Sequence, residues 1–119
     1  MQALLSSLDD DGIVVDGERT MAQRLLDQVR AAIRARHYSR RTEEAYVHWI
    51  RRFIVFHGKR HPREMGAAEI TEFVTWLAVD LHVAGSTQNQ ALSGVLFLYK
   101  DVLRVDIGTV VTPPRARLP

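Results

Sequence analysis

The sequence contains no cysteine among its 119 residues, and no apolar run in it approaches the length of a membrane span. The lack of cysteine excludes disulfide bonds and cysteine-ligated zinc. The lack of a long apolar run argues against a transmembrane helix, which needs about 20 apolar residues. The amino terminus also lacks a basic segment followed by an apolar one, so no signal peptide is predicted. We therefore expect a cytoplasmic protein without a membrane partner.

The motifs of common enzyme and metal sites are also missing. No glycine-rich phosphate loop and no HExxH or GxSxG pattern occurs. Glu43 and Glu44 are adjacent, so on a helix they point in different directions and cannot act as an acid–base pair. His57 and His61 have the spacing of metal ligands, but Gly58 interrupts the helix between them and no third ligand is apparent. We predict no catalytic residue, no metal and no cofactor.

The net charge of +2 hides an uneven distribution of charge along the chain. Residues 1–19 contain five acidic residues and one basic residue, which gives −4. Residues 30–63 contain ten basic residues and two acidic ones, which gives +8. A concentrated positive patch attracts polyanions such as nucleic acids, because binding releases their counterions. An ordinary solvated surface is the alternative interpretation.

Helical periodicity divides the chain into three parts. Residues 1–20 are acidic and have no sustained pattern, which predicts a flexible leader. Four helices are predicted at 21–36, 40–57, 67–82 and 87–104, with N-caps at Thr20, Ser39 and Ser86. Residues 105–119 contain three of the four prolines, which predicts an extended linker. Unequal connections between the helices indicate an all-α bundle of four helices packed as crossed pairs.

Each predicted helix has an apolar face that we assign to the core. The aromatic residues of the second helix belong mainly to this core, although the hydroxyl of Tyr46 could reach a phosphate. Gly58 is predicted to end that helix in a left-handed conformation. Gly94 lies within the fourth helix, where it costs roughly 1 kcal/mol relative to alanine and often permits close packing. The predicted inward residues are Leu25, Leu26, Val29 and Ile33; Tyr46, Trp49, Ile50, Phe53 and Phe56 or His57; Ile70, Phe73, Val74, Leu77 and Leu81; and Ala91, Leu92, Val95, Leu98, Tyr99 and Val102.

The starts of the second and fourth helices carry the candidate binding residues. The second helix opens with "SRRTEEAY", and the fourth opens with "STQNQALS", which has five uncharged polar side chains in a row. A helix start that lacks acidic residues favours a bound anion. Arginine can pair bidentately with guanine, and asparagine or glutamine can pair with adenine. Helix caps followed by a polar exterior are the alternative explanation.

The long segment "RLLDQVRAAIRARHYSRRTEEAYVHWIRRFIVFHGKRHPREMGAAEITEFVTWLAV" and the later "STQNQALSGVLFLYKDVL" resemble the N-terminal, core-binding domain of tyrosine recombinases. The resemblance covers about residues 24–104 and is closest to the integron integrases. It implies a SAM-like four-helix bundle that forms one half of a clamp around recombination-site DNA. It also implies that a linker joins this domain to a separate C-terminal catalytic domain, and that other recombinase protomers are partners on DNA.

The resemblance also implies which residues lie near DNA. Those expected at the major groove are Arg40, Arg41, Thr42, Thr87, Asn89 and Gln90, and those expected beside the backbone are Lys59 and Arg60. The family's catalytic residues belong to the C-terminal domain, so Tyr38, Tyr46 and Tyr99 are not expected to be the nucleophile. We expect this chain, with residues 21–104 as its DNA-binding domain, to bind DNA without cleaving it. A helical protein-interaction module that uses Trp76 and the linker is the alternative.

Overall fold

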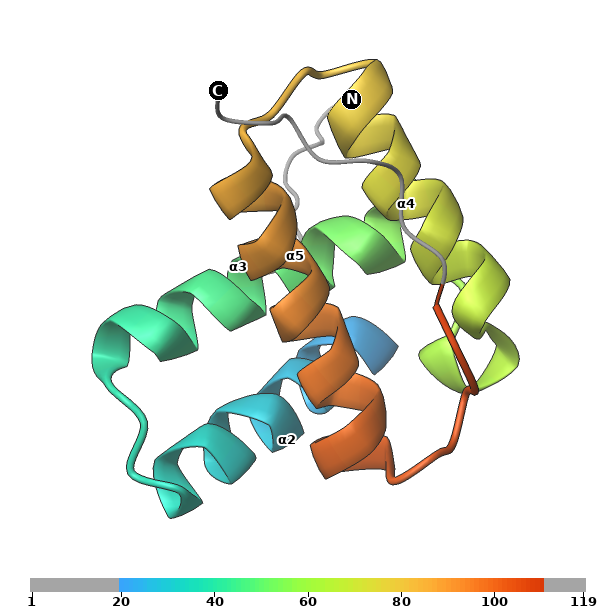
Figure 1. Cartoon of the computed structure of the whole chain (residues 1–119). Helices are drawn as coiled ribbons and strands as arrows, with labels where there is room; N and C mark the ends of the chain where they lie inside the picture. The colour runs from blue at the N-terminus through green and yellow to red at the C-terminus, as the bar shows by residue number, and fades with distance from the viewer. Residues whose placement is uncertain (1–19, 111–119) are drawn as a thin grey trace, which may run out of the picture.

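The computed structural model describes residues 20–110, and this part of the chain contains helices and turns but no β-strand. The α-helices are α2 (Met21–Ala35), α3 (Arg40–Phe56), α4 (Ala67–Val79) and α5 (Gly85–Phe97) (Figure 1). A 3-10 turn, η1, covers Pro62–Glu64, and a π-helical segment, η2, continues α5 over Leu98–Leu103. The all-α prediction is confirmed. The predicted leader up to residue 19 and the predicted linker beyond residue 110 lie outside the described residues.

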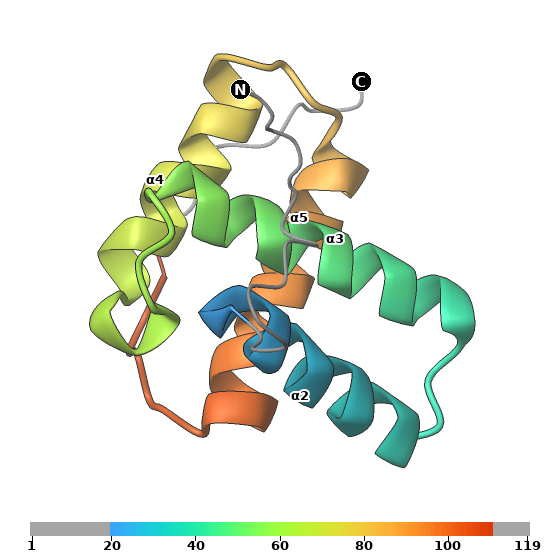
Figure 2. The same ribbon diagram turned by 180° about the vertical axis from the view of Figure 1, so that it is seen from behind.

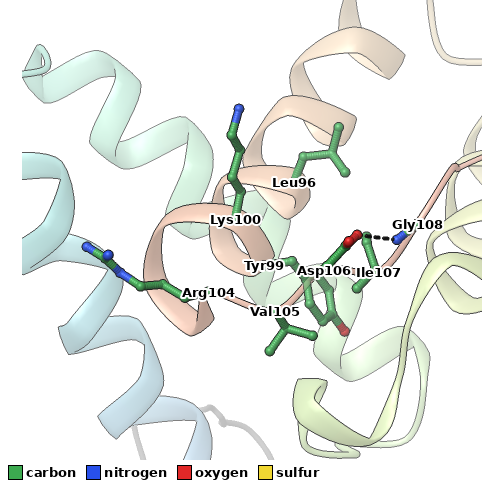
Figure 3. A pocket seen from close by; sticks show the side chains of 8 residues that line it. All are labelled: Leu96, Tyr99, Lys100, Arg104, Val105, Asp106, Ile107 and Gly108. Carbon is green, nitrogen blue, oxygen red and sulfur yellow. Dashed lines mark hydrogen bonds between the residues drawn. The ribbon is translucent and has the colours of Figure 1, made fainter.

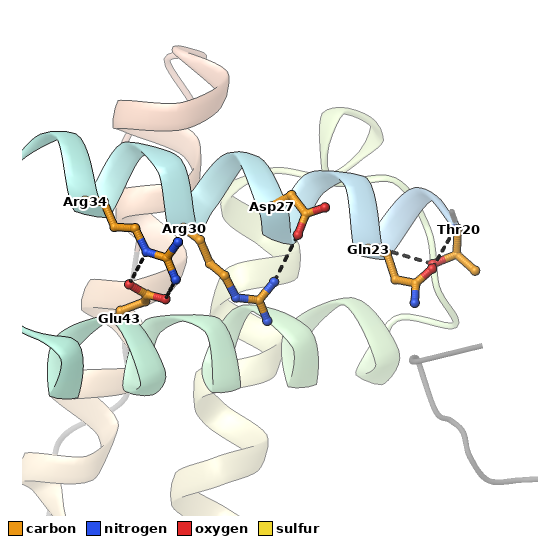
Figure 4. Close-up of polar contacts among 6 residues, drawn as sticks. All are labelled: Thr20, Gln23, Asp27, Arg30, Arg34 and Glu43. Atoms are coloured by element: carbon orange, nitrogen blue, oxygen red, sulfur yellow. Dashed lines mark hydrogen bonds and ion pairs between the residues drawn. The ribbon is translucent and has the colours of Figure 1, made fainter. Parts of the chain in front are cut away.

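The turns that begin α2 and end α3 follow from local sequence signals. Thr20 Oγ1 accepts a hydrogen bond from the backbone N–H of Gln23 at 3.1 Å, and Gln23 Oε1 accepts from the N–H of Thr20 at 3.0 Å (Figure 4). This capping box confirms the N-cap predicted at Thr20. Ser39 likewise accepts from the N–H of Thr42, as predicted. Gly58 adopts φ +72° after α3, which confirms the left-handed position expected there.

An ion pair joins α2 to α3 across the turn between them. The guanidinium of Arg34 donates two hydrogen bonds to the carboxylate of Glu43, at 3.0 and 2.8 Å (Figure 4). These bonds are the main reason that the pKa of Glu43 lies below its usual value. Glu43 therefore does more than oppose the dipole of α3, because it also sets how α2 and α3 lie against each other.

Two helix boundaries differ from the prediction by more than one residue, the end of α4 and the start of α5. The third helix ends at Val79 rather than His82, because the N–H groups of Leu81 and Val83 bond to carbonyls at the end of α4 and close a turn. Leu81 is consequently 43% exposed and does not belong to the inner face. The fourth helix begins at Gly85 with Ala84 as its N-cap, so the N-cap predicted at Ser86 is wrong.

The core lies where the four helices meet and is formed largely by the predicted apolar faces. Tyr46, Phe56, Leu92 and Val102 are only half-buried at its edge. Val47 and Ile54 of α3 are buried too, although the predicted apolar stripe did not include them. The largest fully buried side chains are Tyr99, Phe53, Phe73, Leu26, Ile33, Ile50, Ile54, Ile70, Leu77, Leu98, Val29 and Val74.

The crossing of α3 and α5 is the central contact of the bundle, and Figures 1 and 2 show it from opposite sides. Gly94 of α5 lies at this crossing, where a Cβ atom would be 3.3 Å from the Cα of Tyr46 and 3.6 Å from the Cβ of Trp49. The absence of a side chain at Gly94 therefore lets the two helices approach closely, as the sequence indicated.

The chain after η2 lies against the bundle in an extended form. Val105, Ile107 and Val110 pack against the core, so the described part of the predicted linker is anchored. Residues 105–108 and the end of α5 border an open hollow of about 540 Å³, where Asp106 accepts a hydrogen bond from the N–H of Gly108 at 2.9 Å (Figure 3). Tyr99 lies beneath this segment and donates a hydrogen bond to the carbonyl of Pro62 at 2.7 Å.

Candidate nucleic-acid interface

The first turn of α5 carries neither a capping side chain nor an acidic residue. The N–H groups of a first helical turn have no partner within the helix, and together with the helix dipole they create a positive potential. Asn89 and Gln90 are exposed in this region and Thr87 is half-buried. Gln88 is only 3% exposed and its amide nitrogen lies 3.4 Å from the carbonyl of Val83, so it faces inward rather than toward a ligand.

The start of α3 holds the predicted arginine pair. Arg40 and Arg41 are both exposed, and the Nε of Arg40 lies 3.8 Å from the carboxylate of Glu44. Thr42 is half-buried and belongs to the helix cap, because its hydroxyl accepts a hydrogen bond from Ser39 at 3.1 Å. Within residues 20–110, Arg41 therefore has the guanidinium best placed to meet an external anion at this end of α3.

The outer face of α3 continues this positive surface. His48 and Arg52 follow Arg41 by seven and eleven residues, or about two and three helical turns, so the three side chains lie on one face. We name these three residues the α3 outer face. The guanidinium of Arg52 lies 5.4 Å from the ring centre of Trp49 and 5.9 Å from that of Trp76. These cation–π contacts hold the charge of Arg52 at the edge of the bundle.

His48 lies beside two arginines on this face. Partial removal of its solvent and then the positive charges of Arg52 and Arg51 lower its pKa. The lowered pKa favours the neutral imidazole, so the positive potential of the α3 outer face comes mainly from its arginines. A bound polyanion would favour the charged form of His48.

A hydrogen bond between side chains joins α3 to the start of α5, next to the α3 outer face. The indole Nε1 of Trp49 donates to Oε1 of Gln90 at 3.1 Å. Trp49 lies eight residues beyond Arg41, which is about 12 Å along a helix. The start of α5 therefore lies against the middle of α3, and Gln90 contacts Trp49 rather than the arginine pair. His48 and Arg52 were not among the candidate residues predicted from the sequence, although their spacing of seven and eleven residues from Arg41 indicated one helix face.

Lys59 and Arg60 lie beyond the opposite end of α3 from Arg40. The helix between them has 17 residues, which corresponds to about 26 Å. Lys59 is exposed and has φ +65°, whereas Arg60 donates to the carbonyl of Glu64 at 2.8 Å and lies 3.9 Å from the carboxylate of Glu69. The structure thus separates these two residues from the arginine pair, and any shared ligand must be long.

His57 and His61, which have the spacing of metal ligands in the sequence, each have a structural partner. The Nε2 of His57 lies 2.9 Å from the carbonyl of Glu69, and the Nδ1 of His61 accepts from the N–H of Arg63 at 3.0 Å. Within residues 20–110, no three histidine, aspartate or glutamate side chains come together in a way that could hold a metal ion.

The outer side of α4 carries a separate feature, an open groove of about 720 Å³. Phe56, Trp76 and Val79 contribute apolar walls, and Thr109 of the predicted linker also lines it. Val79 is 58% exposed. The two features named for a protein-interaction module, Trp76 and the linker, are therefore neighbours in the structure.

The described residues thus define a small all-α domain with one cationic helix face. Residues 25–109 match the family described as "Phage integrase, N-terminal SAM-like domain". The chain belongs to this family, and the resemblance to tyrosine recombinases is confirmed at that level. Proteins named "Integrase/recombinase" from Escherichia coli and Pseudomonas aeruginosa are each 52% identical to it over 84 residues. The aligned region is 71% of this chain and 25% of each relative, so the chain matches about a quarter of their length.

Proposed function

We propose that this chain is the DNA-binding domain of a site-specific tyrosine recombinase of the integron type. Residues 21–104 form one half of a clamp around recombination-site DNA in the cytoplasm, and residues 105–119 lead toward a catalytic domain that forms the other half. Strand cleavage and rejoining belong to that other domain, so this chain binds DNA without cutting it. Other recombinase protomers are its neighbours on the DNA.

The main support for this proposal is that two surfaces able to contact a DNA groove, one on α3 and one at the start of α5, lie next to each other. The α3 outer face supplies arginine, and the start of α5 supplies amides and an acid-free helix terminus, with Trp49 and Gln90 in direct contact between them. A major groove accepts a helix, and base edges are read by arginine, asparagine and glutamine side chains. Arg41, Arg52, Asn89 and Gln90 have the chemistry for such contacts.

Residues outside this junction have a different role in the proposal. Lys59 and Arg60 contact the backbone some 26 Å from the arginine pair, a distance that corresponds to about seven to eight base pairs of duplex. Such contacts set the register of the protein on DNA without reading sequence. Arg40 and Thr87 contribute in the same way, and Thr42 contributes by holding the start of α3.

The number of contacts predicts weak, salt-dependent binding. About four to six phosphate contacts give a slope of log K against log salt near −4 to −5. A module of this size buries on the order of 600–1,000 Å² on DNA. In the intact recombinase, the tethered catalytic domain would raise the effective concentration of this domain at its site.

Fluorescence anisotropy with labelled DNA tests the proposal. The chain is titrated into a recombination-site duplex and into the folded single strand at potassium chloride concentrations from 50 to 300 mM. We expect Arg41→Gln to weaken binding and to make the salt slope shallower, because it removes a cation that displaces counterions from the DNA. Arg24→Gln is the matched control, because Arg24 is an exposed arginine on α2. Absence of binding at 50 mM salt, or equal losses in both variants, would contradict the proposal.

The α4 groove favours one second candidate function, contact with another protein. Its apolar walls are Phe56, Trp76 and Val79, and Val79 is the most exposed of the large apolar residues described. Under this alternative, sedimentation velocity in DNA-free buffer shows association that rises with concentration and is lost in Val79→Asp. A monomer at all concentrations counts against it.

A further inference from the structure

We propose that Trp49 is a positioning residue, which orients the amide of Gln90 so that Gln90 presents hydrogen-bond donors to the DNA. This inference rests on the proposed DNA-binding function and adds the chemistry by which one base position is read. The juxtaposition that carries it is the contact between Nε1 of Trp49 and Oε1 of Gln90 at 3.1 Å.

The chemistry of the indole ring decides which way the amide points. An indole N–H can donate a hydrogen bond but cannot accept one. The atom of Gln90 that faces Trp49 must therefore be the carbonyl oxygen, which removes the usual ambiguity between the two ends of a glutamine amide. The amide nitrogen, with both of its hydrogens, is then directed away from Trp49, and Gln90 as a residue is exposed to solvent.

Packing around Trp49 holds its indole ring in place, so the hydrogen bond that orients Gln90 is maintained. The residue is only 6% exposed, and its ring meets Phe73 edge-on with centroids 6.5 Å apart. On its accessible side the ring is covered by Arg52, whose guanidinium lies 5.4 Å from the ring centre. Gly94 of α5 lies next to the Cβ of Trp49, so the helix that carries Gln90 is held at a close distance.

The orientation of Gln90 has a direct consequence for base recognition. A donor pairs with the major-groove acceptors of guanine, N7 and O6, or with O4 of thymine. Adenine presents a single acceptor, N7, beside its N6 donor, and cytosine presents only a donor there. The bidentate pairing of glutamine with adenine needs the amide oxygen to face the base as an acceptor. That oxygen has two lone pairs, and the indole hydrogen occupies one of them and holds the oxygen toward Trp49. Gln90 should therefore favour guanine or thymine over adenine and cytosine at the position it reads.

The hydrogen bond itself is tested on the free chain by NMR. The sequence contains two tryptophans, so two indole N–H signals are expected, and Trp76→Phe assigns them. In Gln90→Ala, we expect the Trp49 signal to shift and its hydrogen to exchange with water several times faster. An unchanged shift and exchange rate would overturn the inference whether or not the chain binds DNA.

Base preference is tested by selection from duplexes that contain a randomised stretch, at 50 mM salt. Gln90→Glu keeps an acceptor for Trp49 but offers no donor, so the preference at one position should change from guanine or thymine to cytosine or adenine. We expect the variant to discriminate between bases at this position by roughly five- to hundredfold, with the opposite preference to the unaltered chain. Gln28→Glu, which makes the same charge change on α2, should leave the preference unaltered.

Trp49→Phe supplies the third arm, because it preserves an aromatic ring and removes the indole donor, together with part of the buried ring volume. Its selected pool should lose the preference at the Gln90 position while overall binding stays within about twofold. If this variant fails to fold, Gln90→Glu still tests the inference, because Gln90 is exposed and its substitution does not disturb the core. If the unaltered chain does not bind DNA at all, both the proposed function and this inference are overturned. Retained binding with an unchanged preference in Gln90→Glu would overturn this inference alone.

Discussion

Replacement of Gly94 by alanine sets two effects of similar size against each other. Alanine inside a helix is favoured over glycine by roughly 1 kcal/mol. The new Cβ, however, would lie 3.3 Å from the Cα of Tyr46 and 3.4 Å from its Cδ1. The first of these atoms belongs to the backbone and cannot rotate away, so α3 and α5 must separate by a few tenths of an ångström. Such overpacking typically costs about 1–3 kcal/mol, and we expect a net loss of about 1 kcal/mol.

Urea unfolding followed by circular dichroism measures this loss. With a slope of about 1–3 kcal/mol per molar urea, a loss of 1 kcal/mol lowers the midpoint by roughly 0.3–1 M. Ser93→Ala is the matched control, because Ser93 is the exposed neighbour of Gly94 on α5 and should gain up to about 0.5 kcal/mol. If Gly94→Ala stabilises the chain as much as Ser93→Ala does, the close approach of α3 and α5 does not constrain position 94 and the reasoning is refuted.

Two further predictions concern single polar contacts. Tyr99→Phe removes the donor to the Pro62 carbonyl and should lower the free energy of unfolding in urea by about 1–3 kcal/mol. A decrease below about 0.5 kcal/mol would contradict the presence of this buried hydrogen bond. Burial also raises the pKa of Tyr99 well above its ordinary value, so ultraviolet titration should show one tyrosine that ionises only when the chain unfolds in alkali. Hydrogen bonding to Arg34 lowers the pKa of Glu43, so its stabilising effect is present above the unfolded-state pKa near 4.3 and is lost as pH falls. Glu43→Gln should therefore have a lower free energy of unfolding than the unaltered chain at pH 7, and the two values should converge near pH 3. A difference that persists at pH 3 would contradict an effect of the Glu43 charge.

The lowered pKa of His48 bears on how binding depends on pH. Because desolvation and two arginines disfavour its charged form, a polyanion at the α3 outer face would reverse the second of these effects. This coupling follows from the position of His48 close to Arg51 and Arg52, so the charges involved all belong to α3. The proposed base recognition by Gln90 has a different origin, because it depends on contact between two helices, α3 and α5.

Local hydrogen bonding explains why much of the fold could be predicted. Thr20 and Ser39 cap helices through bonds to residues three positions away, and Gly58 ends α3 through its own backbone preference. Such signals act within one turn, so they are readable in the sequence. Leu81 was misplaced because α4 ends at Val79 and is followed by a turn whose N–H groups bond to two carbonyls of the helix.

The amino-acid order by itself determined that this chain forms four amphipathic helices, and it determined the residue types at their starts: arginines on α3 and uncharged amides on α5. Helical periodicity and capping need only neighbours within a few positions, so these properties are local. The crossing of α3 and α5 at Gly94 was decided by tertiary packing, and with it the contact of Gln90 with Trp49 rather than with Arg41. Partners 41 residues apart in the chain meet only after the core has set the angle and separation of the two helices, and that geometry depends on the shapes of all the buried side chains together.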